Sequence, residues 1–192
     1  MEVMSLKQNR KTKLNQQKFA LWVGMASILM MFAGWTSAYI VKNAAGNWLE
    51  FALPNAFYIS TAVILLSSVT LQFSYIGYKK QNEKMYKVLL PVTLILGFVF
   101  IAFQYVGWME LFNSGVDLKG NVSGSFTYLI TGAHALHVLG GIAALIVAMV
   151  HALSLKFRYT EKRKNRFELV LQYWHFVGVL WVYLLLFMLN IK

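Results

Sequence analysis

The stretch Phe126–Gly141 reads Phe-Thr-Tyr-Leu-Ile-Thr-Gly-Ala-His-Ala-Leu-His-Val-Leu-Gly-Gly, and it places His134 and His137 inside an apolar run. Most of its other residues are small or aliphatic. An imidazole ring inside hydrocarbon is costly unless it faces protein or water. A helix built on this stretch is therefore predicted to lie inside a membrane bundle, rather than to form a wall that faces lipid.

The helix that carries these histidines is predicted to have two unlike sides. The small and polar side consists of His134, His137, Gly141, Ala144, Ala148 and His151. The bulky aliphatic side consists of Leu139, Ile142, Ile146 and Val150. Small residues let membrane helices approach one another closely, so the first side is expected to face neighbouring helices. Gly140, Ala144 and Ala148 form a second row of small residues beside the histidines.

The composition is typical of an integral membrane protein. Of the 192 residues, 58% are hydrophobic and only 13% are charged, which is too apolar for an ordinary soluble domain. The absence of cysteine excludes disulfides, thiolate ligands and covalent haem attachment. The net charge of +11 comes from short loops between apolar segments, which favours a membrane-surface charge bias over nucleic-acid binding.

Five apolar segments are long enough to cross the ~30 Å hydrocarbon core as helices. They cover about residues 19–41, 56–78, 87–108, 126–151 and 170–190. The predicted fold class is all-α, an integral membrane bundle of five transmembrane helices. A basic cytoplasmic segment, residues 1–18, is expected to precede a single five-helix domain at 19–192.

The distribution of basic residues predicts the orientation of these spans. Fifteen of the eighteen Lys and Arg residues fall in the N-terminal segment, the loop between the second and third spans, and the loop between the fourth and fifth. Basic loops stay on the cytoplasmic side of a membrane. We therefore expect the N-terminus inside and the C-terminus outside, in a bacterial inner membrane.

The histidines allow two interpretations from the residues alone. His134 or His137 could pair with His175 of the fifth span to hold a haem, as in a small membrane electron carrier. Alternatively, each ring hydrogen-bonds to a neighbouring helix or to a lipid headgroup. The seven carboxylates all map to loops, termini or span edges, which argues against a proton or ion transporter and gives a dinuclear metal site no acidic ligands.

Two histidine motifs resemble those of the haem–copper oxidase subunit III family. Thr131–Gly141, Thr-Gly-Ala-His-Ala-Leu-His-Val-Leu-Gly-Gly, is similar to that family's Thr-Gly-x-His-x-x-His-Val-x-x-Gly motif. Tyr173–Val177, Tyr-Trp-His-Phe-Val, followed by Trp181, resembles the motif of its last helix. Phe32–Gly34 and Gln104–Glu110 also fit. Five spans resemble the shorter form, which lacks two N-terminal helices of the mitochondrial version.

The resemblance implies a structural role in a respiratory terminal oxidase, with cytochrome c oxidase as the expected complex. Such a subunit binds no haem or copper itself, packs against catalytic subunit I and other oxidase subunits, and helps to sustain turnover and proton uptake. It holds phospholipid in a cleft between its first two helices and the rest. A quinol oxidase or nitric oxide reductase complex, and membership of a respiratory supercomplex, stay open at this point.

The matched motifs supply candidate residues for packing or for the lipid cleft. These are Thr131, Gly132, His134, His137, Gly141, Trp174, His175, Trp181, Gln104 and Glu110. No catalytic, cofactor-binding or metal-binding residue is expected among them. The chain also departs from the family pattern, since Ile28, Gly107 and Gly178 stand where the family carries acids.

Overall fold

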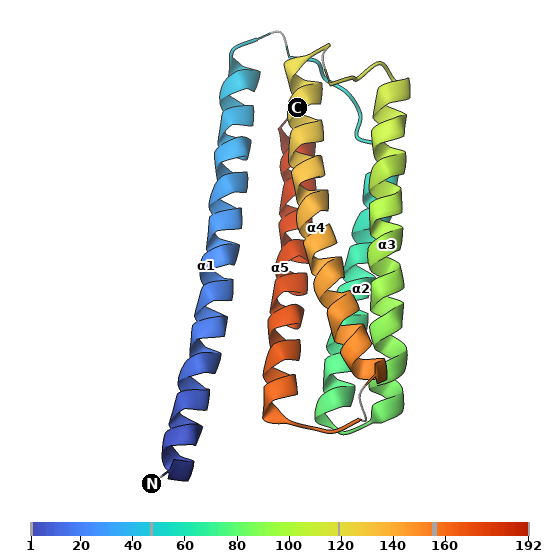
Figure 1. Ribbon diagram of the computed structural model, residues 1–192. Coiled ribbons are helices and arrows are strands. Elements are labelled where there is room, and N and C mark those ends of the chain that lie inside the picture. Colours follow the sequence, from blue (N-terminus) through green and yellow to red (C-terminus); the bar gives the residue numbers. More distant parts are fainter. Residues whose placement is uncertain (1, 47, 119, 155–156, 192) are drawn as a thin grey trace.

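The computed structural model describes residues 2–46, 48–118, 120–154 and 157–191, with backbone alone for residues 2–15. Within these residues the chain forms five α-helices, each long and apolar enough to cross a membrane (Figure 1). They are α1 (Glu2–Ala44), α2 (Asn55–Lys79), α3 (Glu83–Asn113), α4 (Val122–Ser154) and α5 (Glu161–Asn190). The predicted all-α membrane fold is confirmed, and every predicted span lies inside one of these helices.

Helices α2, α3, α4 and α5 form a ring in which each contacts the next and α5 closes back onto α2. Helix α1 contacts α4 and α5, and it lies along one side of the other four (Figure 1). The odd number of spans puts the start of α1 and the end of α5 at opposite ends of the bundle. The histidine helix α4 touches three others, which agrees with its predicted inner position.

A tight turn joins α2 and α3 into a hairpin. Gln81 adopts a left-handed conformation with φ 57°, and the Asn82 N–H donates to the Gly77 carbonyl at 2.9 Å, which closes the end of α2. The Asn82 side chain then accepts from the Met85 N–H at 3.1 Å and caps α3. A Cβ at Gly77 would lie 3.2 Å from the Tyr86 nitrogen, so glycine permits the close approach of the two helices.

Helix α5 begins at Glu161, well before the predicted start near residue 170. The Thr160 hydroxyl accepts from the Arg163 N–H at 3.3 Å, which caps the helix ahead of its apolar part. Its first two turns are therefore charged but helical. The prediction from apolarity located only the apolar part of α5, whereas the helix begins earlier, at its N-cap residue.

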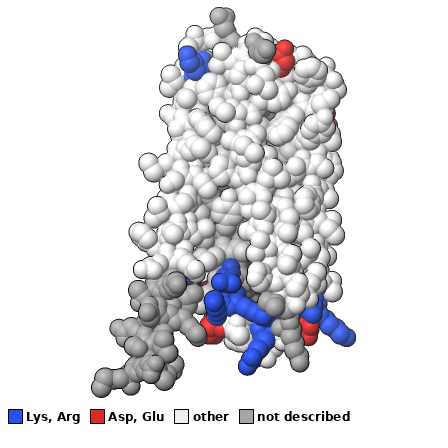
Figure 2. All heavy atoms as spheres, viewed as in Figure 1, with Lys and Arg blue, Asp and Glu red and all other residues white. Residues whose placement is uncertain are grey.

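The charged side chains gather at one end of the molecule (Figure 2). This end, called here the basic end, carries the α2–α3 turn, the start of α5 and the end of α4. Lys42 lies in the last turn of α1 and therefore at the opposite end. The long surface between the two ends is almost free of charge in this view, as a membrane-embedded surface must be.

Candidate functional site

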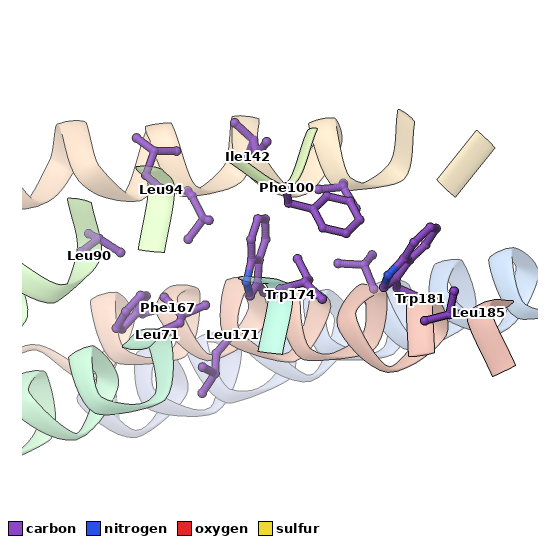
Figure 3. Close-up of a cluster of buried hydrophobic side chains, with 14 of the residues drawn as sticks. Leu71, Leu90, Leu94, Phe100, Ile142, Phe167, Leu171, Trp174, Trp181 and Leu185 are labelled. Atoms are coloured by element: carbon purple, nitrogen blue, oxygen red, sulfur yellow. The ribbon is translucent and has the colours of Figure 1, made fainter. Parts of the chain in front are cut away.

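Trp174 lies at the centre of the bundle, where four helices meet. Its ring is fully buried and rises from α5 toward α4 (Figure 3). A Cβ at Gly97 of α3 would lie 2.9 Å from Trp174 Cη2, and a Cβ at Gly141 of α4 would lie 2.9 Å from Trp174 Cε3. The indole Nε1 donates to Ser67 Oγ of α2 at 3.0 Å. The two glycines therefore form a slot for the ring, and the hydrogen bond fixes its depth.

Trp181 repeats this arrangement two turns further along α5. Its Nε1 donates to Thr61 Oγ1 of α2 at 2.8 Å, and its ring meets Phe57 and Phe100 edge-on. Phe100 reaches into the space between the two tryptophans (Figure 3). Aromatic edge-to-face pairs add about 0.5–1.5 kcal/mol beyond the area they bury. The motif tryptophans thus tie α5 to α2, α3 and α4.

His134 is the most enclosed of the histidines. Its side chain is fully buried and stacks on Trp181, with ring centroids 5.1 Å apart. Phe32 of α1 and Phe100 of α3 contact it edge-on at 6.3 Å and 5.9 Å. Neither ring nitrogen finds a hydrogen-bond partner among the described residues. The interhelical hydrogen bond predicted for this ring is therefore not seen, and its contacts are aromatic.

The other histidines point to different neighbours. His137 Nδ1 lies 2.7 Å from the Ala133 carbonyl of its own helix, and its ring meets Phe32 of α1. His175 Nε2 lies 3.2 Å from Gln72 Oε1 of α2. One ring is thus engaged with α1 and the other with α2, and these two helices make no contact among the described residues. This arrangement does not favour a haem held between His137 and His175.

Two further candidate residues take part in hydrogen bonds between helices. Thr131 is buried on α4 and accepts from Trp108 Nε1 of α3 at 2.9 Å. Gln104 is buried on α3 and donates to Ser60 Oγ of α2 at 2.9 Å. The structure therefore brings Gln104, Thr131, His134, Gly141, Trp174 and Trp181 into the interior of the bundle.

Two candidates lie apart from this interior. Glu110 is exposed on α3. Gly132 is half-buried, and a Cβ there would meet nothing within 4 Å in this chain. Neither residue has a packing role within the part of the chain that the structure describes.

The α4 stripe differs from the prediction in two places. Ile142 was assigned to the bulky outer side, but it is buried and its Cγ1 lies 3.3 Å from the position of a Cβ at Gly97. His151, assigned to the inner side, is exposed and hydrogen-bonds within its own helix to Val147. The reason is that α4 contacts three helices, α1, α3 and α5. Its buried face is therefore wider than the histidine stripe, and the residues that form this face change from one end of the helix to the other.

The positions where the family acids are missing differ in the space that they offer to a side chain. A Cβ at Gly107 would overlap the Phe57 ring, and a Cβ at Gly178 would lie 3.2 Å from Ser68 Oγ. The third, Ile28, packs against the apolar cluster around Phe32. The Phe57 ring therefore occupies the space that an acid would need at position 107, whereas at position 178 the Ser68 side chain would have to shift slightly.

Glu168 is a structural residue that the sequence did not single out. Its carboxylate accepts from Tyr75 Oη of α2 at 2.6 Å and from Lys18 Nζ of α1 at 3.0 Å. It thus joins α1, α2 and α5 at the basic end. A lone acid next to several basic residues looks like any solvated charge in the sequence, so only the fold reveals its partners.

The described residues hold no group of three or more His, Cys, Asp or Glu side chains that could bind a metal ion. The buried motif residues instead pack against neighbouring helices or form hydrogen bonds with them. The arrangement is suited to holding a membrane bundle together.

The comparisons with known proteins agree with this description. The family model for cytochrome c oxidase subunit III matches residues 25–191. A probable cytochrome c oxidase subunit 3 of Nocardia farcinica is 31% identical over 170 residues, which cover 83% of this chain and 80% of that protein. A cytochrome c oxidase subunit 3 of Corynebacterium diphtheriae is 32% identical with the same coverage. That of Struthio camelus is 35% identical over 66% of this chain and 46% of its own length.

The chain therefore belongs to the cytochrome c oxidase subunit III family, as the motifs predicted. It is a multi-pass bacterial membrane protein and a non-catalytic, structural subunit of an oxidoreductase complex. The small haem carrier and the subunit of a quinol oxidase or nitric oxide reductase are not favoured.

Proposed function

We propose that this chain is the subunit III that supports catalytic subunit I of a bacterial cytochrome c oxidase during oxygen reduction. Haem and copper belong to the partner subunits, and this chain contributes a rigid helical surface and bound phospholipid. Association with further oxidase subunits and with a respiratory supercomplex follows from the same role. The observation that carries the proposal is the burial of His134, Trp174 and Trp181, residues of the two family motifs, in a packed aromatic interior.

We propose roles for the motif residues on the same basis. Trp174 and Trp181 position α5 against α2, α3 and α4, while Gly141 and Thr131 let α4 approach its neighbours. His134 fills the space between Phe32, Phe100 and Trp181. Gly132 and Glu110, which have no packing role within this chain, are proposed to face a partner subunit.

The proposed orientation places the basic end in the cytoplasm and the C-terminus outside the inner membrane. The supporting observation is that the basic residues of the α2–α3 turn and of the start of α5 share one end (Figure 2). Short loops rich in Lys and Arg resist transfer across the membrane during insertion. The single five-helix domain after a basic N-terminal segment remains part of this proposal.

Co-purification tests the proposed function. The chain is tagged at its N-terminus in its native host, extracted in a mild detergent and purified, and the proteins that accompany it are identified by mass spectrometry. We expect the catalytic subunit of a haem–copper oxidase at equal stoichiometry, with oxygen consumption driven by reduced cytochrome c. Recovery of the chain without any oxidase subunit would contradict the proposal, and activity with quinol alone would reassign the complex.

A further inference from the structure

Gln72 of α2 is an exposed amide on a helix face that is otherwise apolar. The other exposed residues of α2 in the range 58–73 are aliphatic or aromatic: Tyr58, Ile59, Ala62, Leu65, Leu66, Val69 and Phe73. Lys79 ends α2 at the basic end, so Gln72 lies about 10 Å deeper along the helix. At that depth in a membrane no water is at hand to hydrogen-bond a free amide.

His175 of α5 lies beside Gln72. Its Nε2 is 3.2 Å from Gln72 Oε1, and the imidazole is half-buried. By rise per residue His175 lies about 10 Å deeper than Glu168 of the basic end. The contact uses one ring nitrogen and one end of the amide. Among the described residues, the second ring nitrogen and the other end of the amide have no further hydrogen bond.

A third polar side chain lies one turn away on α5. Gln172 is half-buried, and its enclosed Oε1 finds no hydrogen-bond partner among the described residues. Residues three apart lie on the same side of a helix. Gln72, Gln172 and His175 are together called the polar seam. Within this chain the polar seam has more hydrogen-bonding groups than partners for them.

The polar seam borders an uncovered strip of α5. Helix α5 contacts both α1 and α2 and lies between them in Figure 1, whereas α1 and α2 make no contact among the described residues. Tyr183 Oη lies 3.1 Å from Thr36 Oγ1 of α1, and His175 bonds to α2. At about 100° per residue, Val179 and Leu186 fall between these two contacts. They are 70% and 52% exposed, so the strip between α1 and α2 is open.

Lipid chains suit the other faces of the bundle better than they suit this strip. The exposed residues halfway along α3 and α4 are aliphatic or aromatic, such as Ile95 and Phe98 on α3 and Leu136 and Ile146 on α4. Acyl chains offer neither donors nor acceptors, and an unsatisfied polar group in hydrocarbon is costly. The polar seam therefore calls for a covering surface that itself carries hydrogen-bonding groups.

A transmembrane helix meets this requirement. Membrane helices associate through close packing and through hydrogen bonds of serine, threonine, asparagine, glutamine and histidine side chains. The apolar residues of such a helix can cover Val179 and Leu186, while one polar side chain reaches the polar seam. Whichever ring nitrogen of His175 carries the proton, with the amide of Gln72 turned to match, the pair leaves one donor and one acceptor free. A single side chain that both donates and accepts satisfies both.

We propose that a transmembrane helix of a partner oxidase subunit packs on the α5 strip between α1 and α2, and that a serine, threonine, asparagine or glutamine of that helix hydrogen-bonds to Gln72 and His175. The inference rests on the proposed function, because it names a surface through which this chain joins the complex. It adds the location of the contact within the membrane and the chemistry of the partner side chain.

Site-specific photo-crosslinking tests the surface. A benzophenone amino acid replaces Val179 in the full chain, the native host is irradiated, and crosslinked peptides are identified by mass spectrometry. Ile95, 60% exposed on α3, carries the same probe in a matched control. We expect Val179 to crosslink to a transmembrane segment of an oxidase subunit that has one of the four polar side chains near the point of attachment. Adducts of Val179 with lipid alone or with a protein outside the oxidase, or an equal yield of the same adduct from Ile95, would overturn the proposal.

A pair of apolar substitutions tests the hydrogen bonds. Gln72→Met with His175→Phe removes the hydrogen-bonding groups at similar side-chain size, and Ile95→Met is the control. On a lipid-facing strip the double variant would hold its partners as well as the unmodified chain does. A hydrogen bond between membrane helices strengthens association about threefold, so loss of two should lower the ratio of bound to released partner roughly eightfold in a detergent titration. Unchanged retention would overturn the proposed contact.

The Val179 probe leaves the polar seam intact, so it decides the matter even where the double variant does not fold. The inference and the proposed function fail in different ways. Oxidase subunits that co-purify with the chain, while Val179 crosslinks to lipid alone, would leave the function standing and refute the contact. Recovery of the chain without any oxidase subunit would refute both.

Discussion

The fit of Trp174 between two glycines leads to a quantitative prediction about Gly141. A Cβ added there would lie 2.9 Å from Trp174 Cε3 and 3.0 Å from Cζ3, well inside normal contact. The ring cannot retreat freely, because Gly97 faces it at a similarly short distance and Ser67 holds its nitrogen. Gly141→Ala must therefore push α4 and α5 apart or strain the tryptophan.

The magnitude follows from two opposing effects. Overpacking a well-filled interior costs about 1–3 kcal/mol. Replacing glycine by alanine inside a helix returns about 0.5–1 kcal/mol through the backbone. Gly132→Ala on the same helix provides a matched control, because a Cβ there meets nothing within 4 Å. The free energy of unfolding should therefore be about 1–3 kcal/mol lower for Gly141→Ala than for Gly132→Ala, since the backbone effect cancels.

The assay is reversible unfolding of the purified chain in mixed detergent micelles. A double-mutant cycle with Trp174→Phe sharpens it, because phenylalanine lacks the outer ring that Gly141 faces. Gly141→Ala should cost less in the Trp174→Phe background, by at least half of the overpacking cost. An equal cost in both backgrounds, or no difference between Gly141→Ala and Gly132→Ala, would refute the account of the slot.

Three further predictions concern other parts of the bundle. Gly141→Leu should reduce the amount of assembled complex in membranes far more than Leu139→Ala, because Leu139 is 42% exposed and its loss leaves no enclosed cavity; equal recovery would argue against an inward face at Gly141. Glu168→Gln should lower the free energy of unfolding by about 1–2 kcal/mol, because it weakens the bonds to Tyr75 and Lys18. The control Glu83→Gln breaks an exposed ion pair with Lys87 and should cost at most about 0.5 kcal/mol. Similar costs for the two variants would contradict the bridging role of Glu168. In this cysteine-free chain, Ser114→Cys should react with an impermeant thiol reagent in intact cells and Lys80→Cys only after lysis, and the reverse pattern would invert the proposed topology.

The sequence predicted the number of spans and the family because both depend on local patterns. Long apolar runs have few structural outcomes in a membrane, and the two histidine motifs are specific in order and spacing. The wide inner face of α4 was not predictable from apolarity, because membrane helices are apolar on every side. Ile142 was accordingly assigned to the wrong side, and His151 was expected inside but lies outside.

The remaining features that could not be predicted from the sequence depend on contacts between segments that are far apart in the chain. The Trp174 slot needs Gly97 and Gly141 from two other helices, and nothing in the sequence pairs them with that tryptophan. Glu168 finds Lys18 and Tyr75 across the bundle in the same way. The alanines of α4 predicted a close helix contact, but they line a cavity between α1, α4 and α5, because the placement of α1 decides whether small residues admit a helix.

The central claim is that the motif histidines pack the bundle of a structural subunit and hold no redox centre. The most direct test is the haem-to-protein ratio and the reduced-minus-oxidised spectrum of the purified complex carrying His137→Gln or His175→Gln. Replacing an axial ligand changes or abolishes the absorption of its haem. The account predicts an unchanged spectrum and haem content per complex, with a lower yield or a shorter working lifetime. Loss of one haem per complex, with this chain still bound, would contradict it.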